Sequence, residues 1–114
     1  MAGQPAPVRD PNPVLRRGCM GMAEMQRVEA IVRGYVQGVG FRAFAQRQAR
    51  AIGVVGWVRN TAGGDVQVVA EGTRSDLIAF LDRLRDGPSA AEVQDVELNW
   101  QPYSGAFANF EVRF

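Results

Sequence analysis

The sequence predicts an α+β fold in which two amphipathic helices pack on one face of an antiparallel β-sheet. Two segments show apolar residues at helical spacing, and a glycine follows each of them. The segments around these helices alternate apolar and polar residues, which is typical of half-buried strands. The order along the chain is strand, helix, strand, strand, helix, strand, with a short strand added at the end.

The first strand is predicted at residues 27–33, where the apolar residues sharing one face are Val28, Ala30 and Val32. A glycine-rich segment, residues 34–40, follows this strand. The first helix comes next, and its apolar stripe consists of Phe41, Phe44, Ala45, Ala49 and Ile52. Gly53 stands where a glycine commonly ends a helix.

The second and third strands form a predicted hairpin. The second strand covers residues 54–60, and residues 61–64 provide a glycine-containing turn. The third strand has an apolar face made of Val66, Val68 and Ala70. A variant of the capping box at residues 73–76, with Asp76 in place of glutamate, then begins the second helix.

The second helix is predicted from the apolar stripe of Leu77, Phe80, Leu81 and Leu84. Gly87 and Pro88 end this helix. A fourth strand is indicated by Val96, Leu98 and Trp100, and a last short strand, ending at the C-terminus, by Phe110, Val112 and Phe114. This order fits a two-layer, ferredoxin-like sandwich.

The composition fits one soluble domain: 114 residues with 46% apolar and 22% charged content. No apolar run is long enough to span a membrane, and the N-terminus lacks the apolar core of a secretory signal. The lone Cys19 can form no disulfide within the chain. We therefore expect a cytoplasmic protein without a membrane partner. A monomer is expected as well, although the sequence does not determine the oligomeric state. Residues 1–25, rich in proline, are expected to be a flexible extension, and residues 26–114 the folded domain.

The residue types that are missing restrict the chemistry. The chain has no histidine, and all 13 of its Lys and Arg residues are arginines. These absences exclude a Ser-His-Asp triad, a histidine metal site and a lysine Schiff base, and we expect neither a metal nor a cofactor. The net charge of +1 gives no reason to expect nucleic acid.

The glycine-rich segment before the first helix is a candidate anion site. Its glycines let the backbone turn tightly, so that successive N–H groups can converge on one point. The helix N-terminus adds unpaired N–H groups and a partial positive charge, and Arg42 adds a planar cation. Glycine-rich turns between a strand and a helix also occur where nothing binds. The segment is neither a Walker loop nor a dinucleotide fingerprint.

Asn60 ends the second predicted strand. Asparagine is common in tight turns, and on the local sequence alone a turn residue is the simpler interpretation. Trp57 is expected to pack rather than to form a substrate platform. Arg59 is expected on the opposite face of the strand from Asn60, because neighbouring strand residues point to opposite sides.

Two motifs together resemble the signature of the acylphosphatase family: residues 36–42, VQGVGFR, and residues 56–60, GWVRN. The spacing between Arg42 and Asn60 matches that family, as does the later Gly87-Pro88 with the nearby alanines and Val93. The resemblance covers about residues 26–114.

The resemblance implies a ferredoxin-like fold and metal-free hydrolysis of acyl phosphates, which are small mixed anhydrides of a carboxylate and phosphate. Arg42 would bind the phosphate and Asn60 would orient the attacking water. The backbone amides that would assist are those of Gln37, Gly38, Val39, Gly40, Phe41 and Arg42.

The chain departs from the family pattern in two places. Gln67 stands where the family often has glutamate, and the first 25 residues have no counterpart in the basic domain.

Two alternative functions stay open. One is a binding module for phosphate, a small ligand or RNA, although RNA binding usually needs paired aromatics and a basic surface. The other is a relative of the acylphosphatase-like domain of hydrogenase-maturation proteins that handle carbamoyl phosphate.

Overall fold

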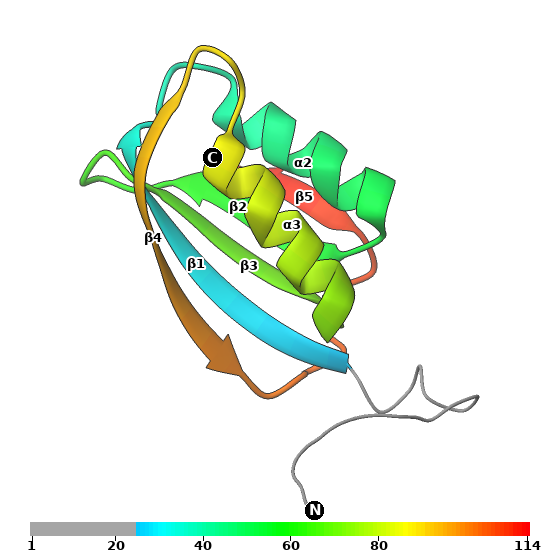
Figure 1. The fold of residues 1–114 in the computed structure, drawn as a ribbon. Coiled ribbons are helices and arrows are strands. Elements are labelled where there is room, and N and C mark those ends of the chain that lie inside the picture. Colours follow the sequence, from blue (N-terminus) through cyan, green and yellow to red (C-terminus); the bar gives the residue numbers. More distant parts are fainter. Residues whose placement is uncertain (1–24) are drawn as a thin grey trace, which may run out of the picture.

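The structure, a computed structural model, describes residues 25–114. These residues form a five-stranded sheet with two helices on one face (Figure 1). The elements are β1 (Met25–Tyr35), α2 (Phe41–Ile52), β2 (Val55–Asn60), β3 (Val66–Thr73), α3 (Arg74–Asp86), β4 (Glu92–Gln101) and β5 (Phe110–Arg113). Residues 1–24 of the extension predicted at residues 1–25 lie outside the described residues, and its last residue, Met25, belongs to β1.

The strands lie in the order β4-β1-β3-β2-β5. The first four strands pair antiparallel, as predicted, but β5 runs parallel to β2, with Gly56 opposite Phe110. The sheet is therefore mixed at this edge rather than antiparallel throughout. The reason is the direction of β4, which opposes that of β2. A chain that leaves β4, crosses to the far edge and turns back must run alongside β2 in the same sense.

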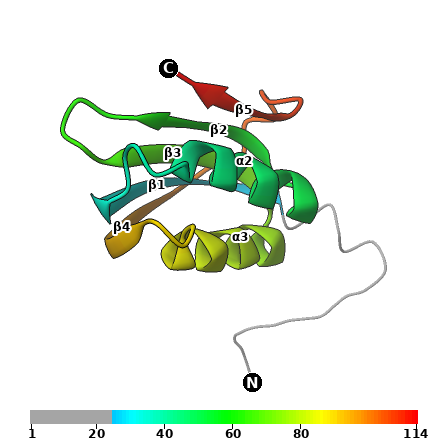
Figure 2. The same cartoon turned by 90° about the horizontal axis from the view of Figure 1, so that it is seen from above.

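The two helices divide the covered face between them. Helix α3 contacts β1, β3 and β4, whereas α2 contacts β2 and β5, and the helices also contact each other (Figure 2). Neither is long and apolar enough to cross a membrane, a finding that concerns residues 25–114 only.

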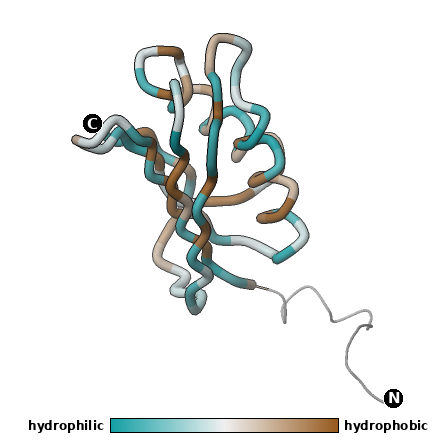
Figure 3. Tube along the Cα trace, turned by 60° about the vertical axis from the view of Figure 1, so that its left-hand side comes forward, coloured by the Kyte–Doolittle hydropathy of each residue, from teal (hydrophilic) through white to brown (hydrophobic). Residues whose placement is uncertain are grey.

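The core lies between this sheet face and the helices. The alternating apolar residues of β1 face those of β3 in register, with Val28 opposite Ala70 and Ala30 opposite Val68. The alternation is visible along the strands in Figure 3. Helix α3 contributes four fully buried side chains, which are the predicted stripe of Leu77, Phe80, Leu81 and Leu84. The rings of Phe80 and Phe110 meet edge to face at 5.5 Å and join this helix to β5.

The predicted ends of the helices are confirmed. Gly53 adopts a left-handed conformation with φ 104° and donates its N–H to the carbonyl of Ala49. The Thr73 hydroxyl accepts a hydrogen bond from the Asp76 amide at 3.1 Å. One detail of the last strand was wrong. β5 ends at Arg113, and Phe114 lies beyond it with its side chain exposed rather than in the sheet.

Candidate active site

The glycine-rich loop between β1 and α2 leaves the sheet at an irregularity in the β1–β4 pairing, between Arg33 and Gly34. Gly34 has φ 132°, and a Cβ there would lie 2.1 Å from the Glu92 carbonyl oxygen. Only glycine fits this position, because the two backbones approach so closely. Val36 is buried and anchors the loop to the core. The loop therefore turns sharply away from β4 and towards the start of α2.

The loop amides are available to a ligand. Gly38 and Gly40 have φ 75° and φ 80°, so the backbone changes direction at both residues. Gly40 caps α2 without a side-chain hydrogen bond. Within the described part of the chain, no backbone amide of residues 37–42 donates to a side chain or to a carbonyl outside the helices and strands. Unpaired amides at a helix N-terminus favour an anion.

Gln37 ties this loop to the turn that follows Asn60. Its Nε2 atom donates to the carbonyl oxygens of Thr61 and Asp65, each at 2.8 Å. The turn is closed by its own hydrogen bonds, including one from the Thr61 amide to the Asp65 carbonyl at 2.8 Å. Because Thr61 and Asp65 stand at the two ends of the turn, their hydrogen bonds with Gln37 fix the loop relative to the end of β2.

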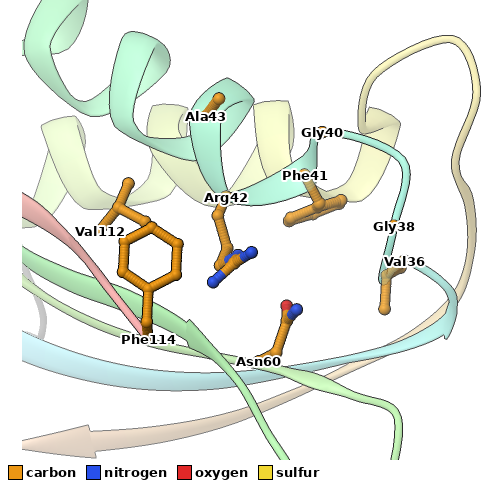
Figure 4. A pocket seen from close by; sticks show the side chains of 9 residues that line it. All are labelled: Val36, Gly38, Gly40, Phe41, Arg42, Ala43, Asn60, Val112 and Phe114. Carbon is orange, nitrogen blue, oxygen red and sulfur yellow. The ribbon is translucent and has the colours of Figure 1, made fainter.

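Arg42 and Asn60 face the same pocket from opposite sides (Figure 4). Arg42 projects from the first turn of α2, and Asn60 is the last residue of β2. Both side chains are half-buried. Arg42 Nη1 donates to the Arg113 carbonyl at 3.3 Å, and the Arg42 guanidinium lies 4.6 Å from the centre of the Phe114 ring. A guanidinium has five N–H donors, so most of them stay available.

The pocket encloses about 390 Å³. Of the residues predicted for the site, those that line it are Gly38, Gly40, Phe41, Arg42 and Asn60. Gln37 and Val39 do not line it, and contributions from their amides stay a prediction. The wall residues that were not predicted are Val36, Ala43, Val112 and Phe114. The alternation of the last strand contained a signal for Val112 and Phe114, but it was interpreted only as packing.

Arg59 stays away from this pocket, as predicted. Its side chain lies over Trp57, 5.5 Å from the ring centre, and its Nε donates to Gln67 Oε1 at 2.8 Å. Both contacts belong to the sheet face opposite the helices. Among residues 25–114, no group of three or more His, Cys, Asp or Glu residues could hold a metal ion.

The fold and the pocket define a ferredoxin-like domain with a cradle suited to an oxyanion. Residues 28–112 match the family model described as Acylphosphatase. The chain is 48% identical over 92 residues to the acylphosphatase of Anaeromyxobacter sp. (strain Fw109-5), covering 81% of this chain and 99% of that protein. The crystal structure of acylphosphatase from Bacillus subtilis matches with a TM-score of 0.76 and 31% identity, covering 78% of this chain and 99% of that chain.

The chain therefore belongs to the acylphosphatase family and is an enzyme of the hydrolase class. The family, the ferredoxin-like fold and the class of enzyme predicted from the sequence are confirmed. The crystal structure of T. kodakarensis HypF is also similar, with a TM-score of 0.69 and 30% identity. That match covers 78% of this chain but only 12% of the other, so the likeness is to one part of a much larger protein.

Proposed function

We propose that this enzyme hydrolyses acyl phosphates with a water molecule that Asn60 orients and a phosphoryl group that Arg42 and the amides of residues 37–42 hold. The family and the fold support acyl phosphate hydrolysis, and the residue roles are our inference. The observation that carries it is the placement of Arg42 and Asn60 on opposite sides of one pocket beside the α2 N-terminus.

The phosphoryl group would lie between the loop amides and the Arg42 guanidinium. Both are donors, and the negative charge of the phosphoryl oxygens matches the helix N-terminus and the arginine. The Arg42 fork can span two oxygens while Nη1 keeps its hydrogen bond to the Arg113 carbonyl. This grip stabilises charge on the phosphoryl oxygens as the bond to the acyl oxygen lengthens.

The Asn60 carboxamide oxygen would accept a hydrogen bond from water and direct the water oxygen at phosphorus. A bond forms between that oxygen and phosphorus, and the bond from phosphorus to the acyl oxygen breaks. The carboxylate leaves with the electron pair, and because it is a weak base it needs no proton donor. One proton of the water passes to a phosphoryl oxygen of the substrate and the other stays on the attacking oxygen, so the products are a carboxylate and inorganic phosphate. Positioning and charge stabilisation then account for catalysis without a general base.

The test is hydrolysis of benzoyl phosphate, followed by its ultraviolet absorbance in the presence of EDTA. We expect Arg42→Ala to lower kcat/KM by a hundredfold or more, which corresponds to ~3 kcal/mol of transition-state stabilisation. Asn60→Ala should chiefly lower kcat, since it misplaces water rather than phosphate. Matched controls are Arg47→Ala, an exposed arginine on the outside of the same helix, and Asn99→Ala, an exposed asparagine on β4.

A change in KM alone for Asn60→Ala would contradict the water-orienting role. A folded wild type without activity would favour a phosphate-binding module, and binding of inorganic phosphate would then be measured.

The proton transfer is tested by comparing hydrolysis rates of acyl phosphates whose phosphates differ in basicity. A rate that does not depend on this basicity would count against the transfer. Hydrolysis of carbamoyl phosphate, followed by the release of inorganic phosphate because this substrate has no benzoyl chromophore, tests the alternative of a protein that handles carbamoyl phosphate. A cytoplasmic location, a monomeric state and the absence of a nucleic-acid partner stay predictions from the sequence.

A further inference from the structure

The pocket has two chemically different sides. On one side lie the loop glycines Gly38 and Gly40, whose amides donate no loop or turn hydrogen bond within residues 25–114. On the other side of Arg42 lie Val112 and the ring of Phe114 (Figure 4). Phe114 is 98% exposed, which is unusual for a large aromatic side chain with a pocket beside it. The apolar side has no role in the hydrolysis described above.

The segment that carries Phe114 is held from both faces of the sheet. Arg113 pairs with Arg59 along β2, and its guanidinium lies 4.9 Å from the centre of the Trp57 ring on the open face. On the helix side, the Arg113 carbonyl accepts the hydrogen bond from Arg42. Because side chains alternate along a strand, fixing Arg113 on the open face directs Val112 towards the helix side, where it lines the pocket. Phe114 follows directly after the strand, and its ring lies against the Arg42 guanidinium. The fold therefore fixes the backbone that leads to Phe114, and the contact with Arg42 places the ring at the edge of the pocket.

The substrate has two parts with different needs. The phosphate requires donors and positive charge, which the loop amides and Arg42 supply. The acyl group is bonded to a phosphate oxygen and must leave this cradle on a side that the loop does not close. Val112 and Phe114 lie on such a side. One region of the ring meets the Arg42 guanidinium, and the rest is open to contact.

The geometry points to Phe114 as a specificity-determining residue that packs against the acyl group and favours acyl phosphates with a flat, aromatic acyl group over short aliphatic ones. An aromatic acyl group covers apolar area on the ring and can stack on it in an offset or edge-to-face arrangement. An acetyl group is too small to cover much of the ring. This inference rests on the proposed hydrolysis of acyl phosphates at the same pocket.

The contact between Phe114 and Arg42 suggests a competing role, in which the ring only holds the arginine in place. The two roles have different consequences. A ring that only holds Arg42 affects every acyl phosphate equally, and it also alters the affinity for inorganic phosphate. A ring that contacts the acyl group affects aromatic substrates much more than acetyl phosphate.

The experiment measures kcat/KM for benzoyl phosphate and for acetyl phosphate, with inhibition by inorganic phosphate, in wild type and Phe114→Ala. Each variant is compared on both substrates, so their different intrinsic reactivities cancel. We expect kcat/KM to fall about tenfold for benzoyl phosphate and by no more than about threefold for acetyl phosphate. The inhibition constant of phosphate should change by less than about threefold, because Arg42 keeps its hydrogen bond to the Arg113 carbonyl.

Two more variants sharpen the test. Phe114→Tyr keeps the ring and should keep the preference for benzoyl phosphate, whereas Phe114→Leu removes the ring and should lose much of it. Tyr103→Ala removes another exposed aromatic, on the segment after β4, and should change neither value. Equal losses on both substrates, or no loss on either, would overturn the inference. A wild type that hydrolyses neither substrate would instead overturn the proposed function.

Discussion

The side-chain amide of Gln37 lies 2.8 Å from the carbonyl oxygen of Thr61, and a second hydrogen bond of the same length reaches the Asp65 carbonyl. This one group therefore sets the separation between the loop, which would hold the phosphate, and Asn60, which would hold the water. Each of these carbonyls also accepts a backbone hydrogen bond within the turn, from the Gly64 and Thr61 amides, so Gln37 joins the loop to a turn that is already closed.

Replacing Gln37 should impair turnover more than substrate binding. We expect Gln37→Ala to lower kcat about tenfold with a smaller change in KM, because loop and water lose their fixed geometry. Stability should fall by about 1–3 kcal/mol through the two lost hydrogen bonds. Gln37→Glu should be at least as harmful, since a carboxylate facing two carbonyls cannot donate. Steady-state kinetics and thermal unfolding measure both effects.

The control for this prediction is Gln94→Ala, which removes an exposed glutamine from β4. It should leave kcat and stability close to those of the wild type. A tenfold rise in KM without a loss of kcat in Gln37→Ala would show that the two Gln37 hydrogen bonds serve substrate binding rather than alignment of the loop with the water.

Lysine should not replace Arg42. The arginine donates to the Arg113 carbonyl through Nη1 and still offers a planar fork to two phosphoryl oxygens. An ammonium carries the charge but cannot make the same bidentate contact, so we expect Arg42→Lys to lose about tenfold or more in kcat/KM, an effect between those of wild type and Arg42→Ala. The unfolding temperature should change little. Full activity of Arg42→Lys would show that charge alone is sufficient.

The parts of the fold that were predictable are those set by local chemistry. Gly53 and Thr73 mark helix ends through their own backbone and hydroxyl groups, and residues 61–64 mark the hairpin. Each of these signals involves neighbours along the chain, which is why it can be recognised without the three-dimensional structure. Arg42 and Asn60 were predicted in another way, through the resemblance of two motifs and their spacing, and they line one pocket, while their roles stay a prediction.

The parts that were missed depend on contacts between distant segments. The parallel pairing of β5 with β2 follows from a crossing between opposite sheet edges, and nothing near Phe110 specifies it. The place of Phe114 beside Arg42 has the same origin. Glu71 is polar in a strand pattern, yet it is buried because residues of the segment between β4 and β5 donate to it.

Glu71 should make the stability of the protein depend on pH in the acid range. Its carboxylate accepts hydrogen bonds from the Ser104 hydroxyl at 2.6 Å, the Ser104 amide at 2.9 Å and the Gly105 amide at 3.0 Å. Burial by itself raises the pKa of Glu71, but these hydrogen bonds and the charge of Arg27 together hold the pKa below its ordinary value of 4.5.

A lowered pKa means that the stabilisation is fully present above pH 4.5 and is lost as the pH falls below it, through the pKa of the folded state. Glu71→Gln should cost about 1–3 kcal/mol at pH 7, since it removes the charge and replaces one of the two acceptor oxygens with an NH2 donor that faces the Ser104 or Gly105 amide. The difference from wild type should shrink on acidification. Urea unfolding at pH 7 and pH 3 measures it, with the exposed Glu92→Gln as control. A difference that does not depend on pH would contradict the role of the charge.

Gly56, like Gly34, should be far less replaceable than the glycines with positive φ that have open space where a Cβ would lie. It has φ 143°, and a Cβ there would lie 1.9 Å from the Val69 carbonyl oxygen of the neighbouring strand. Its amide also donates to the Asn109 carbonyl at 3.0 Å, which helps to hold β5 against β2. Gly56→Ala must therefore move one strand as well as strain its own backbone. We expect a loss of about 3 kcal/mol or more in the free energy of unfolding.

The matched control is Gly53→Ala, because Gly53 has φ 104° but nothing within 4 Å of the position its Cβ would take. Gly53→Ala should lower the free energy of unfolding only by the strain of the positive φ, about 1–2 kcal/mol. Urea unfolding of both variants separates the two contributions, since the backbone strain is common to them and the clash with Val69 is not. Equal losses would mean that the β2–β3 contact relaxes freely around an added methyl group. In that case the close approach at Gly56 would have no part in keeping β5, and with it Val112 and Phe114, at the pocket.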